Sequence, residues 1–127
     1  MVGIGRTPAR GGPTRGDIYI VAFPEAGGAV ILGPHPALIV STDRMNRAGG
    51  TLLACPMTSQ MQHDPEVYLP PYLVPADARS TGLSRDGYVK VDQVHTLSAA
   101  ALGSFMGRAN PEVMTAVDDA LRFVLDL

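Results

Sequence analysis

The sequence is poor in the features that cross-link a chain or anchor it in a membrane. Cys55 is the only cysteine among 127 residues, which excludes an intrachain disulfide and a zinc site built from several cysteines. There is no apolar run of about 18 residues, and the glycine-, proline- and arginine-rich first residues lack the apolar core of a signal peptide. We therefore expect a cytoplasmic protein.

The sequence also lacks an excess of positive charge. Lys90 is the only lysine, and 10 lysine and arginine residues face 12 aspartates and glutamates, which gives a net charge of −2. Proteins that hold nucleic acid over a broad surface are usually strongly basic. Any nucleic-acid site in this chain is therefore expected to be local.

The composition is that of one globular domain with many turns. Hydrophobic residues make up 46% of the chain, and 14 glycines and 11 prolines favour short elements and a β-rich fold. Residues 1–14 combine glycine, proline and arginine without periodicity, which predicts a flexible N-terminal tail before a domain over residues 15–127. Cys55 follows an apolar run and is expected to fill space in a buried strand.

Runs of β-branched and aromatic residues predict several short strands. The expected strands lie at residues 17–23, 36–41, 51–56, 66–69 and 87–94, with a further short one at 104–106. The polar link 42–50 and residues 97–102 are each expected to hold a short helical turn. Pro56 is expected to end the third strand, and Pro70 and Pro71 the fourth.

The last segment carries the clearest helix pattern. Asn110 is a suitable cap, Pro111 suits the first helical position and Glu112 complements the positive end of a helix. Apolar residues from Val113 to Leu125 follow helical spacing on one face. The sequence therefore predicts an α+β fold, a small β-barrel of five to seven strands with a C-terminal amphipathic helix.

Polar side chains gather at two expected strand ends. His35 stands between two prolines at the start of one strand, and Thr58, Ser59 and Gln60 follow the end of another. An imidazole exchanges protons near neutral pH, and hydroxyl groups donate hydrogen bonds. A strand cap or a side-chain turn would use the same residues, so both a functional and a structural interpretation stay open.

The order of four motifs resembles the MazF/PemK family of toxins from type II toxin–antitoxin systems. They are Arg15-Gly-Asp-Ile-Tyr19, Pro34-His-Pro-Ala-Leu-Ile-Val-Ser41, Ala54-Cys-Pro-Met-Thr-Ser-Gln60 and Gly87-Tyr-Val-Lys-Val-Asp-Gln-Val-His-Thr-Leu97. The resemblance covers about residues 15–127. It implies an SH3-like barrel, a homodimer, a cognate antitoxin and sequence-specific cleavage of single-stranded RNA, such as mRNA, without a metal or another cofactor.

The resemblance also implies site residues. Thr58 matches the catalytic hydroxyl of the family, whereas His35 stands where the family normally has an arginine. A glutamate that is common five residues earlier falls at Val30. Some members are described as using an arginine and an aspartate on a later strand, at positions that match Lys90 and Asp92, and alternation along residues 87–94 would put these two on one face.

The candidate catalytic residues are therefore His35, Thr58, Lys90 and Asp92. The candidate substrate contacts are Ser59, Gln60, Arg44, Arg85 and Gln93. Two functions remain open at this point. One is RNA cleavage, and the other is a catalytically altered or inactive relative that binds an antitoxin or another target such as gyrase, which the histidine at position 35 favours.

Overall fold

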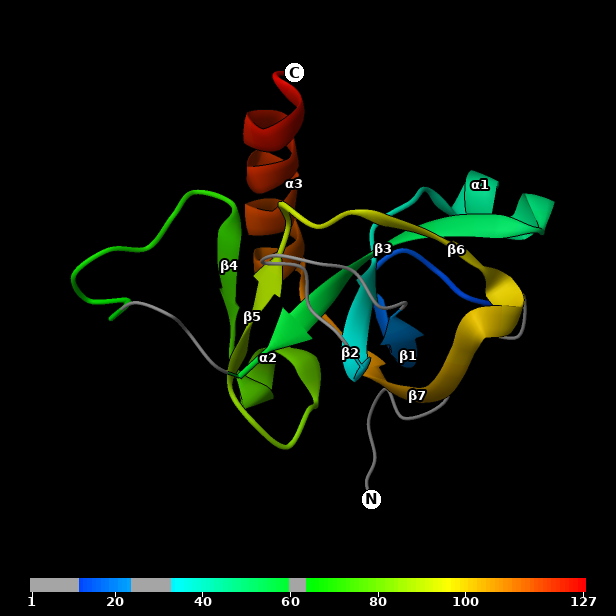
Figure 1. The fold of residues 1–127 in the computed structure, drawn as a ribbon, viewed down its shortest axis with the longest axis horizontal. Coiled ribbons are helices and arrows are strands. Elements are labelled where there is room, and N and C mark those ends of the chain that lie inside the picture. Colours follow the sequence, from blue (N-terminus) through cyan, green and yellow to red (C-terminus); the bar gives the residue numbers. More distant parts are fainter. Residues whose placement is uncertain (1–11, 24–32, 60–63) are drawn as a thin grey trace.

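The computed structural model describes residues 12–23, 33–59 and 64–127 and has an α+β fold (Figure 1). Its elements are β1 (Asp17–Phe23), β2 (Gly33–Ile39), α1 (Asp43–Ala48), β3 (Thr51–Thr58), β4 (Leu73–Ala76), α2 (Ala78–Thr81), β5 (Gly87–Lys90), β6 (His95–Ser98), the 3₁₀ turn η1 (Ala99–Ala101), β7 (Leu102–Arg108) and α3 (Pro111–Leu125). The seven strands form an antiparallel sheet in the order β4-β5-β3-β2-β1-β7, and β6 pairs with β3. No pairing in the described part of the chain joins β4 to β7, so the structure shows the sheet of the expected barrel but not its closure.

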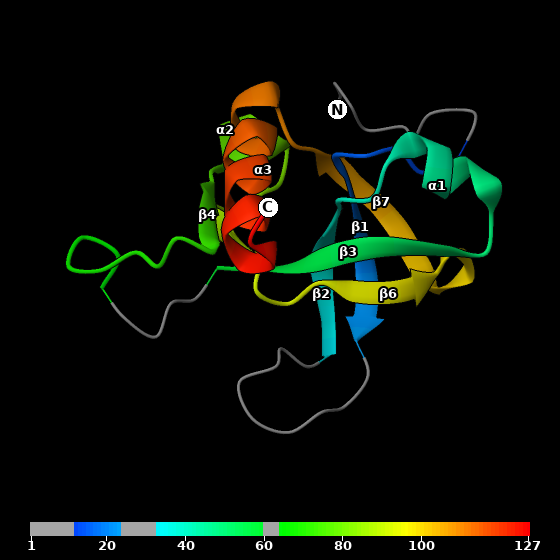
Figure 2. The ribbon, with the colours of Figure 1, turned by 90° about the horizontal axis from the view of Figure 1, so that it is seen from above.

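The strand β3 connects the two halves of the sheet. Thr51–Ala54 pair with β6, Ala54–Pro56 pair with β2, and Met57–Thr58 pair with β5. Figure 2 shows β3 running from α1 at one end to the side of β4 and α3 at the other. The prediction that this strand ends at Pro56 is wrong, because the chain stays extended for two more residues and gains β5 as a new neighbour.

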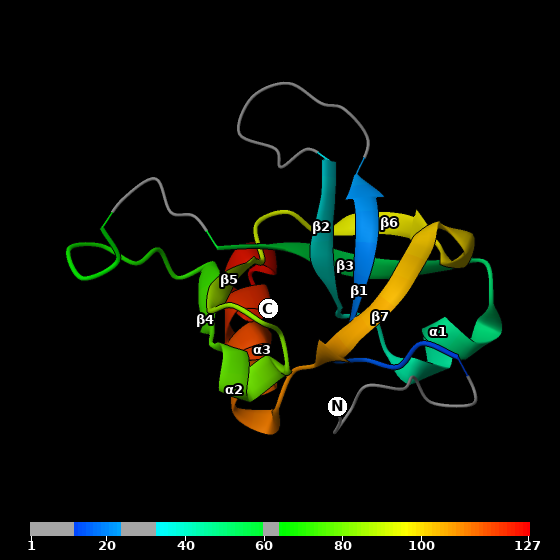
Figure 3. The same cartoon turned by 90° about the horizontal axis from the view of Figure 1, so that it is seen from below.

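Two apolar clusters lie on the two faces of the sheet. The first packs the sheet against α3 and includes Ile18, Leu38 and Val117, each with no exposed surface. The second includes Val21, Ile39 and Leu97 and lies away from α3. Burying one such side chain stabilises the fold by about 1.5–3 kcal/mol. Figure 3 shows α3 beside β4 and β5, while β1, β2 and β7 cross on the other side.

The helix α3 confirms the C-terminal prediction. The Asn110 side chain accepts a hydrogen bond from the Val113 backbone N–H at 2.9 Å, and Pro111 occupies the first turn. Val113, Val117 and Ala120 are the buried residues, in agreement with helical spacing. Asp126 ends the helix in the left-handed conformation, with φ of 57°.

Other predictions need correction. Residues 66–69 form no strand, and Val67 and Tyr68 are 82% and 56% exposed; the strand on this side is β4, at Leu73–Ala76. The expected strand 87–94 ends at Lys90, where the chain turns. The helical turn expected in 97–102 is the 3₁₀ turn alone, since residues 95–98 belong to β6.

Of the two short helices α1 and α2, the sequence predicted only the first. The helical turn expected in the link 42–50 is confirmed as α1, which Thr42 caps through a hydrogen bond from the Met45 N–H. The short helix α2 was not predicted. Asp77 caps it by accepting from the Ser80 N–H at 2.8 Å, and Gly82 ends it with φ of 81°.

Arg15 joins three segments that are distant in the sequence. Its backbone N–H donates to an Asp43 carboxylate oxygen at 2.6 Å, its Nε to the Val40 carbonyl at 2.8 Å, and its Nη2 to Asp118 Oδ1 at 2.6 Å. These contacts tie the start of β1 to α1, to the end of β2 and to α3. Residues 1–11 of the predicted tail lie outside the described residues, whereas Thr14 donates its N–H to Asp17.

A buried carboxylate at the start of β1 depends on one arginine. Asp17 has no exposed surface, and its Oδ2 accepts from the Thr14 N–H at 2.8 Å. Its Oδ1 lies 2.7 Å from Arg108 Nη2 and has no hydrogen-bond partner of good geometry. The charge of Arg108 at the end of β7 is therefore what compensates the burial of this oxygen.

Arg108→Ala is expected to destabilise the protein because it leaves the Asp17 carboxylate buried without its opposite charge. We expect a loss of about 1–3 kcal/mol in the free energy of unfolding, measured by chemical denaturation. Arg122→Ala is the matched control, since it breaks an exposed ion pair with Asp119 and is expected to cost at most about 0.5 kcal/mol. Equal effects of the two substitutions would contradict this role for Arg108.

Candidate functional site

A pocket of about 340 Å³ opens where β2, β3, β7 and the loop before β5 meet. It brings together four of the residues singled out by the sequence. They are His35 from β2, Thr58 and Ser59 from the end of β3, and Arg85 from the loop between α2 and β5. The rest of its lining consists of Pro36, Met57, Leu83, Ser84, Asp86, Gly87 and Met106.

The sheet fixes His35 and Thr58 relative to each other. Ala37 of β2 pairs with Pro56 of β3. This pair is the last one that joins β2 to β3, and His35 and Thr58 each lie two residues beyond it on their own strands. His35 is also held from its other side, where it pairs with Val21 of β1. The two candidate catalytic side chains therefore start from paired, hydrogen-bonded strands rather than from loops.

Gly87 allows β5 to lie against the end of β3. A β-carbon at this position would lie 2.7 Å from the Thr58 carbonyl oxygen, which is closer than van der Waals contact. Thr58 pairs with Tyr88 and Met57 with Val89, so any displacement of β5 would change the backbone that carries Thr58. Position 87 therefore favours glycine for its small size.

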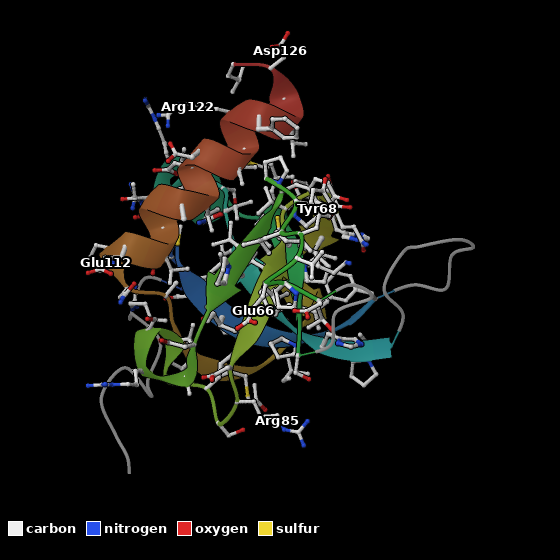
Figure 4. The ribbon with its side chains drawn as sticks, turned by 90° about the vertical axis from the view of Figure 1, so that its left-hand side faces the viewer. Glu66, Tyr68, Arg85, Glu112, Arg122 and Asp126 are labelled. Atoms are coloured by element: carbon white, nitrogen blue, oxygen red, sulfur yellow. The ribbon has the colours of Figure 1, made fainter. Side chains whose placement is uncertain are left out.

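The loop that carries Arg85 and Asp86 is anchored to α2. Asp86 Oδ1 accepts a hydrogen bond from the Ala78 backbone N–H at 2.8 Å, across the base of the loop. Arg85 is exposed, and Figure 4 shows its side chain projecting outward below β5. An exposed guanidinium at the pocket rim is suited to contact a phosphate.

Sequence reasoning missed most of the pocket wall. Met57, Leu83 and Met106 supply apolar surface from three separate elements, and Asp86 adds a carboxylate. Met57 was missed because the strand was expected to end at Pro56, and nothing in the sequence indicated that Met106 of β7 reaches the same place. Asp86 had a usable signal, because it directly follows Arg85 and precedes the glycine that opens β5.

Other predicted site residues lie elsewhere. Lys90 ends β5, Asp92 and Gln93 follow in the turn after it, and none of them lines the pocket. Because β5 ends at Lys90, the expectation that Lys90 and Asp92 share one face of a strand is wrong. These residues continue from β5 along the molecule, away from Thr58.

Arg44 and Gln60 are the remaining candidate substrate contacts. Arg44 is exposed on α1, which leads into Thr51 at the opposite end of β3 from Thr58. Along an extended strand of this length the two ends are about 20 Å apart. Arg44 is therefore remote from the pocket, and Gln60 lies outside the described residues.

The other titratable candidates are inert or packed. Cys55 has no exposed surface, and burial, with a smaller contribution from the charge of Asp92, raises the pKa of its thiol to about 12. This confirms a structural cysteine. The His95 ring packs against Phe23 with 4.7 Å between ring centroids, and partial burial lowers the pKa of His95.

Two negative findings apply to the described part of the chain. No group of three histidine, cysteine, aspartate or glutamate side chains is placed to hold a metal ion there. Among the same residues, no helix has both the length and the apolar character required to span a membrane.

Gly87→Ala is expected to push β5 away from Thr58 and to distort the pocket. We expect a loss of about 1–3 kcal/mol in the free energy of unfolding and shifted amide resonances for Thr58 and Ser59 by NMR. Ser84→Ala changes an exposed side chain on the same rim and is expected to stay within about 0.5 kcal/mol of the parent protein. Unchanged stability and unchanged resonances in Gly87→Ala would show that the close approach is not needed.

Comparison with known proteins identifies the family to which the chain is similar. The family described as "PemK-like, MazF-like toxin of type II toxin-antitoxin system" matches residues 14–125. Endoribonuclease EndoA of Bacillus subtilis is 30% identical over 113 residues, which cover 89% of this chain and 94% of that protein. Endoribonuclease MazF9 of Mycobacterium tuberculosis is 32% identical over 118 residues, which cover 89% of this chain and 96% of that protein.

The fold is also similar to solved structures. An endoribonuclease from a mycobacterial species, solved in complex with its cognate antitoxin, superimposes with a TM-score of 0.70 at 28% sequence identity. The match covers 91% of this chain and 96% of that one. The similarity therefore extends over nearly the whole of both chains.

Proposed function

Because the chain belongs to the PemK/MazF-like toxin family of type II toxin–antitoxin systems, we propose that it is a cytoplasmic toxin that cleaves single-stranded RNA without a metal. The observation that carries this proposal is the convergence of His35, Thr58, Ser59 and Arg85 on one pocket. Relatives that are endoribonucleases, at about one-third identity or slightly less, support the same reaction.

The reaction needs three kinds of group. The ribose 2′-hydroxyl attacks the neighbouring phosphorus, the bond from phosphorus to the 5′-oxygen breaks, and a 2′,3′-cyclic phosphate and a 5′-hydroxyl result. One group must take the proton of the 2′-hydroxyl, another must give a proton to the leaving 5′-oxygen, and donors must stabilise the charge that develops on the phosphate.

The pocket residues divide these tasks. His35 takes the proton of the 2′-hydroxyl, since a neutral imidazole has one ring nitrogen that accepts a proton, and water gives the leaving 5′-oxygen its proton. The hydroxyls of Thr58 and Ser59 donate hydrogen bonds to the phosphate oxygens, and Arg85 adds positive charge at the rim. Lys90, Asp92 and Gln93 are proposed to contact RNA that leaves the pocket along β5 and the turn after it.

The partners follow from the family. We propose a homodimer that is inhibited by a cognate antitoxin, as the mycobacterial endoribonuclease was solved with its antitoxin. Large apolar side chains near the end of α3, namely Phe123, Leu125 and Leu127, are 56–83% exposed and provide surface for association. An antitoxin segment that covered the pocket would exclude RNA from His35 and Thr58.

Thr58→Ala is expected to reduce RNA cleavage because it removes a preorganised donor to the phosphate. We expect a fall of about 10²–10³ in rate, measured on a mixed-sequence single-stranded RNA in the presence of EDTA. Thr115→Ala, which removes the same hydroxyl from an exposed position on α3, is the matched control and is expected to keep full activity. Intact RNA after incubation with a high concentration of the folded parent protein would contradict the proposal.

A catalytically altered relative that only binds its partners is the second candidate, because His35 occupies the position where the family normally has arginine. His35→Arg separates the two candidates. If His35 transfers a proton, arginine cannot replace it, and we expect cleavage to fall by about 10²–10⁴ and the pH–rate profile to lose its inflection. A large gain in cleavage would instead identify a degenerate nuclease that arginine restores.

A further inference from the structure

The pocket has an apolar wall beside its catalytic rim. Pro36, Met57, Leu83 and Met106 form this wall; Met57 is 2% exposed and Met106 is 36% exposed. Its volume of about 340 Å³ is near the lower end of ligand-sized pockets, which start at about 300 Å³. Thioether side chains make favourable contacts with aromatic rings, so a single flat ring is a suitable occupant.

Asp86 gives the same pocket a negative group that phosphate chemistry does not use. A carboxylate repels a phosphate, so the presence of Asp86 in the pocket lining points to the base of a nucleotide rather than to the phosphate backbone of RNA as the occupant. The hydrogen bond from the Ala78 N–H to Oδ1 at 2.8 Å holds the carboxylate in place. An ionised carboxylate only accepts hydrogen bonds, and its other lone pairs remain available for a donor.

Base chemistry then distinguishes the possible occupants. Adenine, cytosine and guanine carry an exocyclic amino group that donates to a carboxylate, as aspartate accepts from the amino group of cytosine elsewhere. Uracil has no amino group; its one ring donor, N3–H, lies between two carbonyl oxygens that a carboxylate repels. The unstacked bases of single-stranded RNA expose these edges for recognition.

We propose that this pocket binds one unpaired nucleobase of RNA, and that Asp86 selects a base with an exocyclic amino group over uracil. The proposal rests on the proposed RNA cleavage and adds the substrate class of the pocket. Met57 and Met106 hold the ring of the base, Asp86 accepts from its amino group, and Thr58 and Arg85 lie at the rim where the adjoining phosphate passes.

Binding of uncleavable probes tests this without relying on catalysis. The probes are short fluorescent single-stranded RNAs, fully 2′-O-methylated, that consist of uridine with A, C or G at one central position, and an all-uridine strand. We expect the parent protein to bind the amino-bearing probes about tenfold more tightly than the all-uridine probe, measured by fluorescence anisotropy. RNA cleavage is assayed in parallel.

Asp86→Asn is the discriminating variant. The amide oxygen of asparagine still accepts from the Ala78 N–H, but its amino group favours carbonyl oxygens, so we expect the preference against uracil to disappear. Asp119→Asn makes the same change at an exposed site on α3 and is expected to keep the preference. Met106→Ala is expected to weaken the binding of all probes carrying A, C or G, because it removes part of the apolar wall.

Each outcome decides the proposal. Equal binding of all probes, no binding of any probe, or an unchanged preference in Asp86→Asn would overturn it, and a side chain of a protein partner would then be the better occupant. A base preference that depends on Asp86 in a protein that cleaves no RNA would support the base pocket and contradict the proposed function. Cleavage without an Asp86-dependent preference would leave the function standing and remove this inference.

Discussion

The site depends on one strand that belongs to both halves of the sheet. β3 pairs with β6 over Thr51–Ala54, with β2 over Ala54–Pro56 and with β5 over Met57–Thr58. A proline in its interior is tolerated because β3 changes partner on one side next to Pro56, where a missing N–H costs little. Extension beyond Pro56 is what carries Thr58 into the pocket that His35 also lines, and beside Gly87. If the strand ended at Pro56, the pocket would have neither its hydroxyl groups nor its wall at Met57.

Strands and a loop contribute different properties to this pocket. His35 and Thr58 lie on paired strands above a core in which Leu38 and Cys55 have no exposed surface. A rigid core of this kind keeps the two side chains in position, as a catalytic or binding site requires. Arg85 and Asp86 lie on a loop that one hydrogen bond fastens to the start of α2. Substitutions in the loop are therefore expected to change the binding properties of the pocket with little loss of stability in the sheet. Substitutions of the buried residues beneath His35 or Thr58 are expected to change the sheet itself.

The sequence predicted the elements whose signals are local. The caps of α3, the apolar run of β1 and the polar strand ends at His35 and Thr58 all rest on neighbours in the chain. Residues 66–69 were wrongly expected to form a strand because valine and tyrosine favour strands only where a sheet exists to pack against. The true edge strand β4 contains the exposed Pro75, which an edge tolerates on its unpaired side. Met106 escaped prediction because only the tertiary fold brings it to the pocket of Thr58, whereas Asp86 was overlooked although it directly follows Arg85.

The charge of the pocket bears on how a chain with a net charge of −2 would hold the RNA of the proposed function. Arg85 and Asp86 are adjacent, so their opposite charges largely cancel at a distance. Exposed charges are in addition screened beyond about 8–10 Å at physiological salt. Long-range attraction of the phosphate backbone is therefore weak at this rim. In the proposed complex, affinity would come instead from contact, through hydrogen bonds from Thr58 and Ser59 and burial of a ring against the methionines. In the proposed complex, binding would therefore depend on the base that enters the pocket more than on the charge of the strand, and this would favour sequence selectivity in a chain with a net charge of −2.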